Sequence, residues 1–157
     1  MTSSAAARVA ETGQEERLIL AEFLPYRLSV VAERVSRTFA ARYEAEFGLT
    51  IPEWRVMAVL GERAPRSTQE VIETTEMDRV KVSRAVIRLA DKRLVARSPV
   101  PGDARAQQLR LTRAGLAMYR RIVPIAQRLQ SELVAALAPG EIATLERILA
   151  KLRTVVG

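Results

Sequence analysis

The sequence contains no cysteine and no histidine in its 157 residues. Without cysteine the chain can form no disulfide, no thiolate metal site and no thiol-based redox switch. Without histidine it also lacks a common zinc ligand, the commonest general base and the usual pH-sensing side chain. These absences exclude Ser-His-Asp and Cys-His catalysis, and the sequence has no glycine-rich phosphate-binding loop. We therefore expect a protein that is not an enzyme and that holds neither a metal nor another cofactor.

Aromatic residues make up only 4% of the chain, and glycine and proline occur seven times each. Aliphatic residues and alanine dominate instead, which favours a mainly α-helical protein. No run approaches the roughly 18 consecutive apolar residues that a membrane helix needs, and the N-terminus carries no apolar signal segment. We expect a cytoplasmic protein with no membrane partner, in which residues 1–16 form a disordered leader and residues 17–157 a single domain.

Positive charge is concentrated in one part of the chain. The formal net charge is +7, and residues 77–113 contain ten basic and three acidic side chains. That segment therefore carries the whole net charge, and the rest of the chain sums to zero. A solvated surface normally mixes both signs, so this local excess indicates a surface that binds a polyanion. The alternative is a surface that serves only solubility.

The spacing of apolar residues and capping signals predicts a series of helices. Apolar residues recur every three or four positions from Arg17 to Phe47, and the regular helix is expected to begin near Pro25. The sequences Thr-Ile-Pro-Glu at 50–53 and Ser-Thr-Gln-Glu at 67–70 predict capping boxes that open two short helices. The first of these is expected to end at Gly61.

The remaining elements follow from the same signals. Asp78 is expected to cap a basic helix that ends near Arg93, and Thr112 is expected to cap a long helix that begins at Arg113. A further helix follows Pro139. Between them, alternating residues and the turn sequence Pro-Gly-Asp at 101–103 predict a β-hairpin whose tip spans about 100–106.

This order of elements predicts a winged helix-turn-helix, in which the basic helix fits the major groove of double-stranded DNA. The expected contact residues on that helix are Arg79, Lys81, Ser83, Arg84 and Arg88. At the hairpin tip, the wing, Arg105 is expected to enter the neighbouring minor groove, with Asp103 orienting the arginine or the turn. The alternative interpretation makes Asp103 an ordinary turn residue.

Several segments together resemble the MarR family of bacterial transcription regulators. They are FLPYRL at 23–28, FGLT at 47–50, EWRV at 53–56, DRVKVSRAVIRL at 78–89, and a wing pattern made by Arg97, DAR at 103–105 and LRLT at 109–112. The sequence departs from the family pattern twice. Arg93 stands where a glycine is usual, which implies a differently capped helix end, and Ala104 stands where a second arginine is common.

The resemblance implies a homodimer that binds a palindromic operator. Its dimerisation helices would lie at about 17–47 and 113–157, and its DNA-binding part at about 50–112. The sequence supports the dimer independently, because the terminal helices carry long apolar faces that one small winged domain cannot cover. A two-fold dimer places two recognition helices about one DNA turn apart, which predicts an inverted repeat. The alternative is a monomer with its helices folded on themselves.

The resemblance also implies a repressor that a small aromatic effector releases from DNA. Tyr26, Arg27, Trp54 and Met57 are the candidate ligand-binding residues. Trp54 and Met57 would form an apolar wall, and Arg27 would pair with the anionic group of an aromatic carboxylate or its thioester. The alternative is that Trp54 and Met57 belong to the core and that Arg27 forms a structural ion pair. The corresponding alternative function is a DNA-binding regulator or architectural protein without a small-molecule switch.

Overall fold

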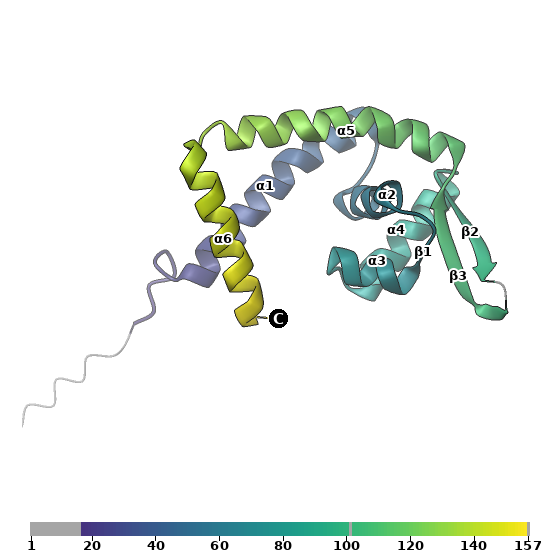
Figure 1. Cartoon of the computed structure of the whole chain (residues 1–157), viewed down its shortest axis with the longest axis horizontal. Coiled ribbons are helices and arrows are strands. Elements are labelled where there is room, and N and C mark those ends of the chain that lie inside the picture. The colour runs from purple at the N-terminus through teal and green to yellow at the C-terminus, as the bar shows by residue number, and fades with distance from the viewer. Residues whose placement is uncertain (1–16, 101, 157) are drawn as a thin grey trace, which may run out of the picture. The chain divides into compact units, whose positions relative to one another are not determined.

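The structure, a computed structural model, describes residues 17–100 and 102–156, except for the side chains of residues 104–106. The leader expected at residues 1–16 lies outside the described residues. The elements in Figure 1 are α1 (Leu24–Phe47), α2 (Ile51–Glu62), β1 (Arg66–Ser67), α3 (Thr68–Thr75), α4 (Arg79–Asp91), β2 (Val95–Val100), β3 (Asp103–Leu111), α5 (Arg113–Val134) and α6 (Pro139–Val156). The predicted mainly α-helical winged fold is confirmed.

The chain divides into two compact units, and the boundary between Val35 and Ser36 falls within α1. In the first unit a turn precedes α1, and the Phe23 amide donates a hydrogen bond to the Ile19 carbonyl. Most apolar side chains of this unit are exposed, including Leu24 and Val31. The second unit holds the remaining elements and the hydrophobic core.

Each predicted cap is confirmed in the second unit. Thr50 and Glu53 form a capping box at the start of α2, and Ser67 and Glu70 form another at the start of α3. Asp78 caps α4 by accepting a hydrogen bond from the Lys81 amide, and Thr112 caps α5 in the same way. These side chains satisfy backbone amides that a helix leaves without an internal partner, so the loops fix where the helices begin.

The sheet has one strand more than the predicted hairpin. Strands β2 and β3 form that hairpin, and the short β1 pairs antiparallel with β3, with Arg66 opposite Leu109. Strand β1 was not predicted, because its two residues are too few to show a periodicity. The predicted hairpin tip was also too long, since β3 already begins at Asp103 and Gly102 alone has a positive φ, of 87°, in the described part of the turn.

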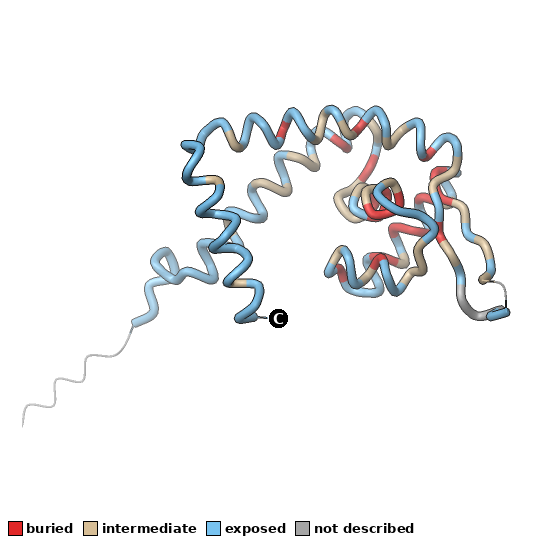
Figure 2. Tube along the Cα trace, in the orientation of Figure 1, coloured by how far each residue is buried: buried red, intermediate tan, exposed pale blue. Residues whose placement is uncertain are grey.

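The core lies where α2, α3 and α4 meet the strands and α5. Figure 2 shows its buried residues gathered in these elements, whereas α6 has no buried residue. Leu49, Met57, Val82, Leu89, Leu109 and Ile122 are among its fully buried side chains. Burial of these side chains is the main force that holds α4 against the rest of the second unit. No helix in the described part of the chain is both long and apolar enough to cross a membrane.

Two sequence predictions about helix ends were wrong. Gly61 lies inside α2 rather than ending it. Glycine is needed there because a Cβ would lie 2.5 Å from the Tyr119 ring. Arg93 adopts the left-handed φ of 57° that glycine favours. The Leu94 amide then donates to the Leu89 carbonyl at 2.8 Å and the Arg93 amide to Ala90 at 2.9 Å, so α4 ends as it would with glycine.

Candidate nucleic-acid interface

Helix α4 has a buried face and an exposed face. Its buried residues are Val82, Ala85, Val86 and Leu89. This spacing follows the helical period and turns the other positions away from the core. All five residues predicted on this helix lie outside the buried face: Arg79, Lys81, Arg84 and Arg88 are exposed, and Ser83 is half-buried. The structure therefore presents a basic helix surface without burying any of its charges.

Polar contacts fix the start of α4. The Lys81 amide donates to Asp78 Oδ1 at 2.8 Å, and Lys81 Nζ lies 3.2 Å from Asp78 Oδ2. The hydrogen bond from that backbone amide is the main reason that the pKa of Asp78 is lowered. Arg79 Nη2 donates to Gln69 Oε1 at 2.9 Å and so links α4 to α3. The first turn of α4 is thus held in place before any partner binds.

A positively charged hollow lies between α4 and the start of α2. It has a volume of about 150 Å³ and is lined by Thr50, Pro52, Lys81, Arg84, Ala85 and Arg88. Three of these side chains, Lys81, Arg84 and Arg88, carry a positive charge. Such a set of charges favours an anionic group, and a DNA phosphate has the right charge for it.

The wing reaches the same surface from the other side. Arg97 lies opposite Leu109 and Pro99 opposite Gln107 in the pairing of β2 with β3. Asp103 is exposed at the start of β3. Arg105 lies in β3, but its side chain is outside the described part, so its predicted contact with DNA stays a prediction.

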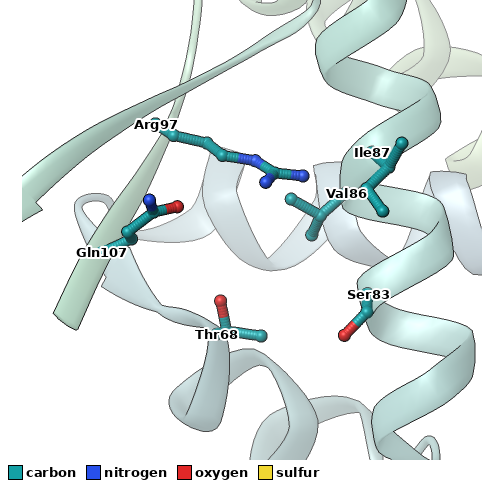
Figure 3. Close-up of a pocket in the computed structure, with 6 residues that line it drawn as sticks. All are labelled: Thr68, Ser83, Val86, Ile87, Arg97 and Gln107. Carbon is teal, nitrogen blue, oxygen red and sulfur yellow. The ribbon is translucent and has the colours of Figure 1, made fainter. Parts of the chain in front are cut away.

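Arg97 and Gln107 belong to this surface although the sequence analysis did not name them as contact residues. With Thr68, Ser83, Val86 and Ile87 they line a hollow of about 90 Å³ between the wing and α4 (Figure 3). Figure 3 shows the Arg97 guanidinium extending from the strand toward α4. Strand alternation offered the signal, because Arg97 stands two positions after the buried Val95 and so shares its face of the sheet.

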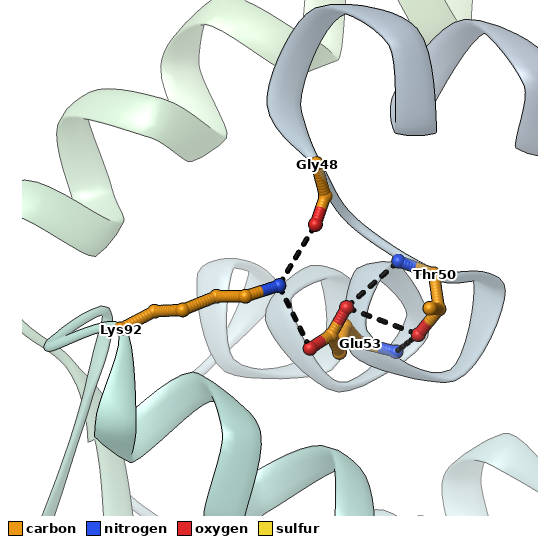
Figure 4. A network of polar contacts seen from close by, with 4 residues as sticks. All are labelled: Gly48, Thr50, Glu53 and Lys92. Atoms are coloured by element: carbon orange, nitrogen blue, oxygen red, sulfur yellow. Dashed lines mark hydrogen bonds and ion pairs between the residues drawn. The ribbon is translucent and has the colours of Figure 1, made fainter.

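An ion pair at the far end of α4 ties this helix to α2 (Figure 4). Lys92 Nζ donates to Glu53 Oε1 at 2.9 Å and to the Gly48 carbonyl at 2.8 Å. Glu53 is only 1% exposed, and its Oε2 accepts from the Thr50 amide at 2.7 Å. Burial by itself raises the pKa of Glu53, but the hydrogen bonds from Thr50 and Lys92 outweigh it, so the pKa is lowered. The carboxylate is therefore ionised and fully paired.

The structure places the four candidate ligand residues in two separate units. Tyr26 and Arg27 are exposed on the part of α1 that belongs to the first unit. In the second unit Met57 is fully buried, and the half-buried Trp54 ring lies 5.1 Å from that of Tyr43 and 6.2 Å from that of Tyr119. Trp54 and Met57 thus have a role in packing, and a shared ligand site stays a prediction.

Comparison with known proteins agrees with this arrangement. The family model described as MarR family matches residues 47–106, which include α2, α3, α4 and most of the wing. The HTH-type transcriptional repressor NicR of Pseudomonas putida is 31% identical over 93 residues, which cover 59% of this chain and 59% of the repressor. Residues 47–106 of the chain therefore match the MarR family. The chain spans about 60% of the length of the curated MarR-type relatives it matches.

Solved MarR-family structures extend the likeness over most of the chain. The MarR family regulator SPO1453 of Silicibacter pomeroyi is 28% identical and has a TM-score of 0.76, with 90% of this chain and 100% of that chain covered. BpsR of Bordetella bronchiseptica, whose DNA binding is regulated by 6-hydroxynicotinic acid, shares the fold at 24% identity and a TM-score of 0.79, with 88% and 98% covered. MarR-family members are transcription regulators and not enzymes, as the sequence predicted.

Proposed function

We propose that this chain is a MarR-family protein, a homodimeric DNA-binding transcription regulator that acts as a repressor in the cytoplasm. The observation that carries the proposal is the exposed basic face of α4, with the wing beside it. An α-helix fits the major groove of DNA, and the side chains near its start reach the base edges. Arg79, Lys81, Ser83 and Arg84 occupy those first turns. Repression is proposed because the curated relative NicR is named as a repressor.

The position of each arginine along α4 divides the proposed contacts into contacts with bases and contacts with phosphates. Arg84 lies in the second turn of α4 and is proposed to contact bases, whereas Arg88 lies one turn further and is proposed to contact phosphate. Asp103 and Arg105 of the wing are proposed to lie at the neighbouring minor groove, with Asp103 orienting the turn. The DNA-binding part would then comprise residues 50–112, as the sequence analysis expected.

A second copy of the chain is the proposed cover for the exposed apolar residues of the terminal helices. In the second unit these include Leu133 on α5 and Leu145, Ile148 and Leu149 on α6, which are 44–50% exposed. An apolar face of this kind, without cover in a single chain, is typical of an interface. Residues 17–47 and 113–157 would form the dimer, which then predicts an inverted-repeat operator. Light scattering should give twice the 17.4 kDa mass of one chain.

The test is fluorescence anisotropy with the DNA upstream of the chain's own gene, a scrambled duplex and a salt series. Operator affinity should exceed non-specific affinity by about 10³ or more and should fall steeply with salt. Arg84→Ala and Arg105→Ala should each weaken operator binding while the dimer stays intact. Arg120→Ala, which removes the same charge from an exposed position on α5, is the matched control. Equal binding to both duplexes would contradict specific recognition of that DNA.

We further propose that a small aromatic carboxylate or its thioester releases the protein from DNA. Support comes from BpsR, whose DNA binding responds to 6-hydroxynicotinic acid, an aromatic acid. Tyr26, Arg27, Trp54 and Met57 are the proposed ligand residues, with Arg27 pairing with the carboxylate. Arg27→Ala should abolish release by the effector and leave operator binding unchanged. Loss of both would instead identify Arg27 as a structural residue.

One observation favours the alternative, a DNA-binding regulator or architectural protein without a small-molecule switch. Met57 is fully buried and Trp54 packs between two aromatic rings, so both residues already have packing partners. A panel of aromatic acids and thioesters, added to the protein–operator complex, separates the two functions. Release by one compound supports the switch, and unchanged binding with every compound supports the alternative.

A further inference from the structure

The outermost line of α4 carries two aliphatic residues beside its charged ones. Taking 100° per residue, the direction opposite Val82, Ala85, Val86 and Leu89 coincides with Val80 and Ile87, which stand seven residues apart. Val80 is 57% exposed and Ile87 is 49% exposed. Arg84 lies between them along the helix and Asp91 follows them near the same line, whereas Lys81 and Arg88 flank one side and Arg79 and Ser83 the other. Two aliphatic side chains thus stand at the centre of the basic surface.

The fold gives these two side chains no packing role. Neither belongs to the buried core nor to the apolar residues packed against it. Among the described side chains of residues 50–112, Val80 and Ile87 are the exposed large hydrophobic residues. The others in the second unit lie on α5, on α6 or, in the case of Leu137, in the turn between these helices. In the proposed dimer, the helices of a second copy cover these other exposed residues. Val80 and Ile87 face the side on which DNA is proposed to bind.

We propose that Val80 and Ile87 bind the C5-methyl groups of thymines and so determine which operator sequence is preferred; this inference rests on the proposed DNA-binding function. The thymine methyl is the apolar group that base pairs present in the major groove, and small aliphatic side chains contact it. Seven residues along a helix span about 10 Å. Since consecutive base pairs rise by about 3.4 Å, each half-site should contain two such thymines about three base pairs apart.

The two positions differ in their surroundings. Val80 lies in the first turn of α4 beside Arg79 and Lys81, so its methyl groups would enter the groove with two positive charges around them. Ile87 borders the hollow between α4 and the wing, next to Ser83 and Arg97 (Figure 3). The thymine bound by Ile87 should therefore lie on the side of the half-site that the wing approaches.

The test replaces thymine by deoxyuridine, which removes the methyl group and leaves every hydrogen-bonding group unchanged. The operator is first obtained by selecting tightly bound duplexes from a random pool. Each thymine of the half-site is then replaced in turn, at symmetric positions in both half-sites. At two positions the affinity should fall by about fourfold for each methyl group lost, the value expected for withdrawing one methyl group from water. Two equivalent half-sites would give about 15-fold.

Alanine variants assign each thymine to its side chain. Val80→Ala should weaken binding to the thymine operator and remove the effect of deoxyuridine at one position only. Ile87→Ala should do the same at the other position. Both substitutions are at exposed helical sites and should leave the fold intact. The two variants serve as controls for each other, since each should leave the effect of deoxyuridine at the other position unchanged.

The outcomes are distinguishable. If the selection recovers no preferred duplex, the proposed function fails and the inference fails with it. If an operator is bound but deoxyuridine changes nothing at any position, the function stands and the thymine contacts are refuted. If deoxyuridine lowers the affinity equally in wild type and in both alanine variants, other side chains contact the methyl groups and the assignment to Val80 and Ile87 is overturned.

Discussion

Replacing Lys92 by methionine should destabilise the protein at neutral pH. The change removes two hydrogen bonds, one to the buried Glu53 carboxylate and one to the Gly48 carbonyl. A hydrogen bond to a charged group contributes about 1.5–3 kcal/mol and a neutral one about 1 kcal/mol. Because Lys92 is 39% exposed, water can replace part of what is lost. We therefore expect the free energy of unfolding to fall by about 2 kcal/mol.

The pH dependence of this loss tests its cause. The pKa of Glu53 is lower in the folded chain than its ordinary value, so the ionised carboxylate stabilises the fold above about pH 4.3. That stabilisation disappears as the pH falls through the lowered folded pKa. In the Lys92→Met variant burial raises the pKa with less opposition, and the buried carboxyl takes up a proton at higher pH. The difference between the two proteins should therefore be largest near pH 7 and shrink on acidification.

Urea unfolding at equal protein concentrations, from pH 7 to pH 3.5, measures both quantities. For a chain of this length, 2 kcal/mol corresponds to a fall in Tm of roughly 4–8 °C. Lys151→Met makes the same substitution at an exposed position on α6 and should change stability by less than about 0.5 kcal/mol. A double-mutant cycle with Glu53→Gln should give a coupling energy of about 1–2 kcal/mol. A loss below about 0.5 kcal/mol at pH 7 would refute the structural role of the pair.

Substitutions at Arg93, Gly115 and Asp78, with two control variants, test helix ends and close packing in the second unit by the same unfolding measurement. Arg93→Gly should stabilise the protein by about 1 kcal/mol, since Arg93 holds a left-handed φ of 57°; a destabilisation would contradict the described end of α4. Gly115→Ala should cost more than about 2 kcal/mol because its Cβ would overlap the Leu94 carbonyl, whereas Gly140→Ala, with nothing within 4 Å, should be neutral or slightly stabilising. Asp78→Ala should lower the free energy of unfolding by about 1 kcal/mol through loss of the α4 cap. Asp78→Asn should keep most of that stabilisation, because asparagine also caps helices.

Helix starts and the buried face of α4 were predictable because they depend on residues close together in the chain. A capping box places the hydroxyl and the carboxylate three positions apart. The pairs Thr50 with Glu53 and Ser67 with Glu70 can therefore be recognised in the sequence. The spacing of Val82 and Leu89 likewise reveals the buried side of α4. The basic surface followed directly, since charges on the remaining positions had to face outward.

Features that join distant residues were not predictable in this way. Lys92 and Glu53 stand 39 positions apart, and nothing local distinguishes Lys92 from the other basic residues of the segment. Strand β1 exists only because β3 supplies hydrogen-bonding partners. Gly61 resembles a helix terminator until the Tyr119 ring is seen against it. In each case the second partner comes from a remote part of the chain.

The sequence by itself determined the mainly helical class, the caps, the hairpin and the position of the positive charge, because local hydrogen bonds and the helical period govern them. Tertiary packing alone decided which side chains join α4 to the rest of the fold. Lys92, at the end of α4, pairs with the buried Glu53 of α2 although 39 positions separate them. Arg97 meets α4 because the sheet folds against that helix. Such contacts depend on the free energy of the whole core, which no short segment contains.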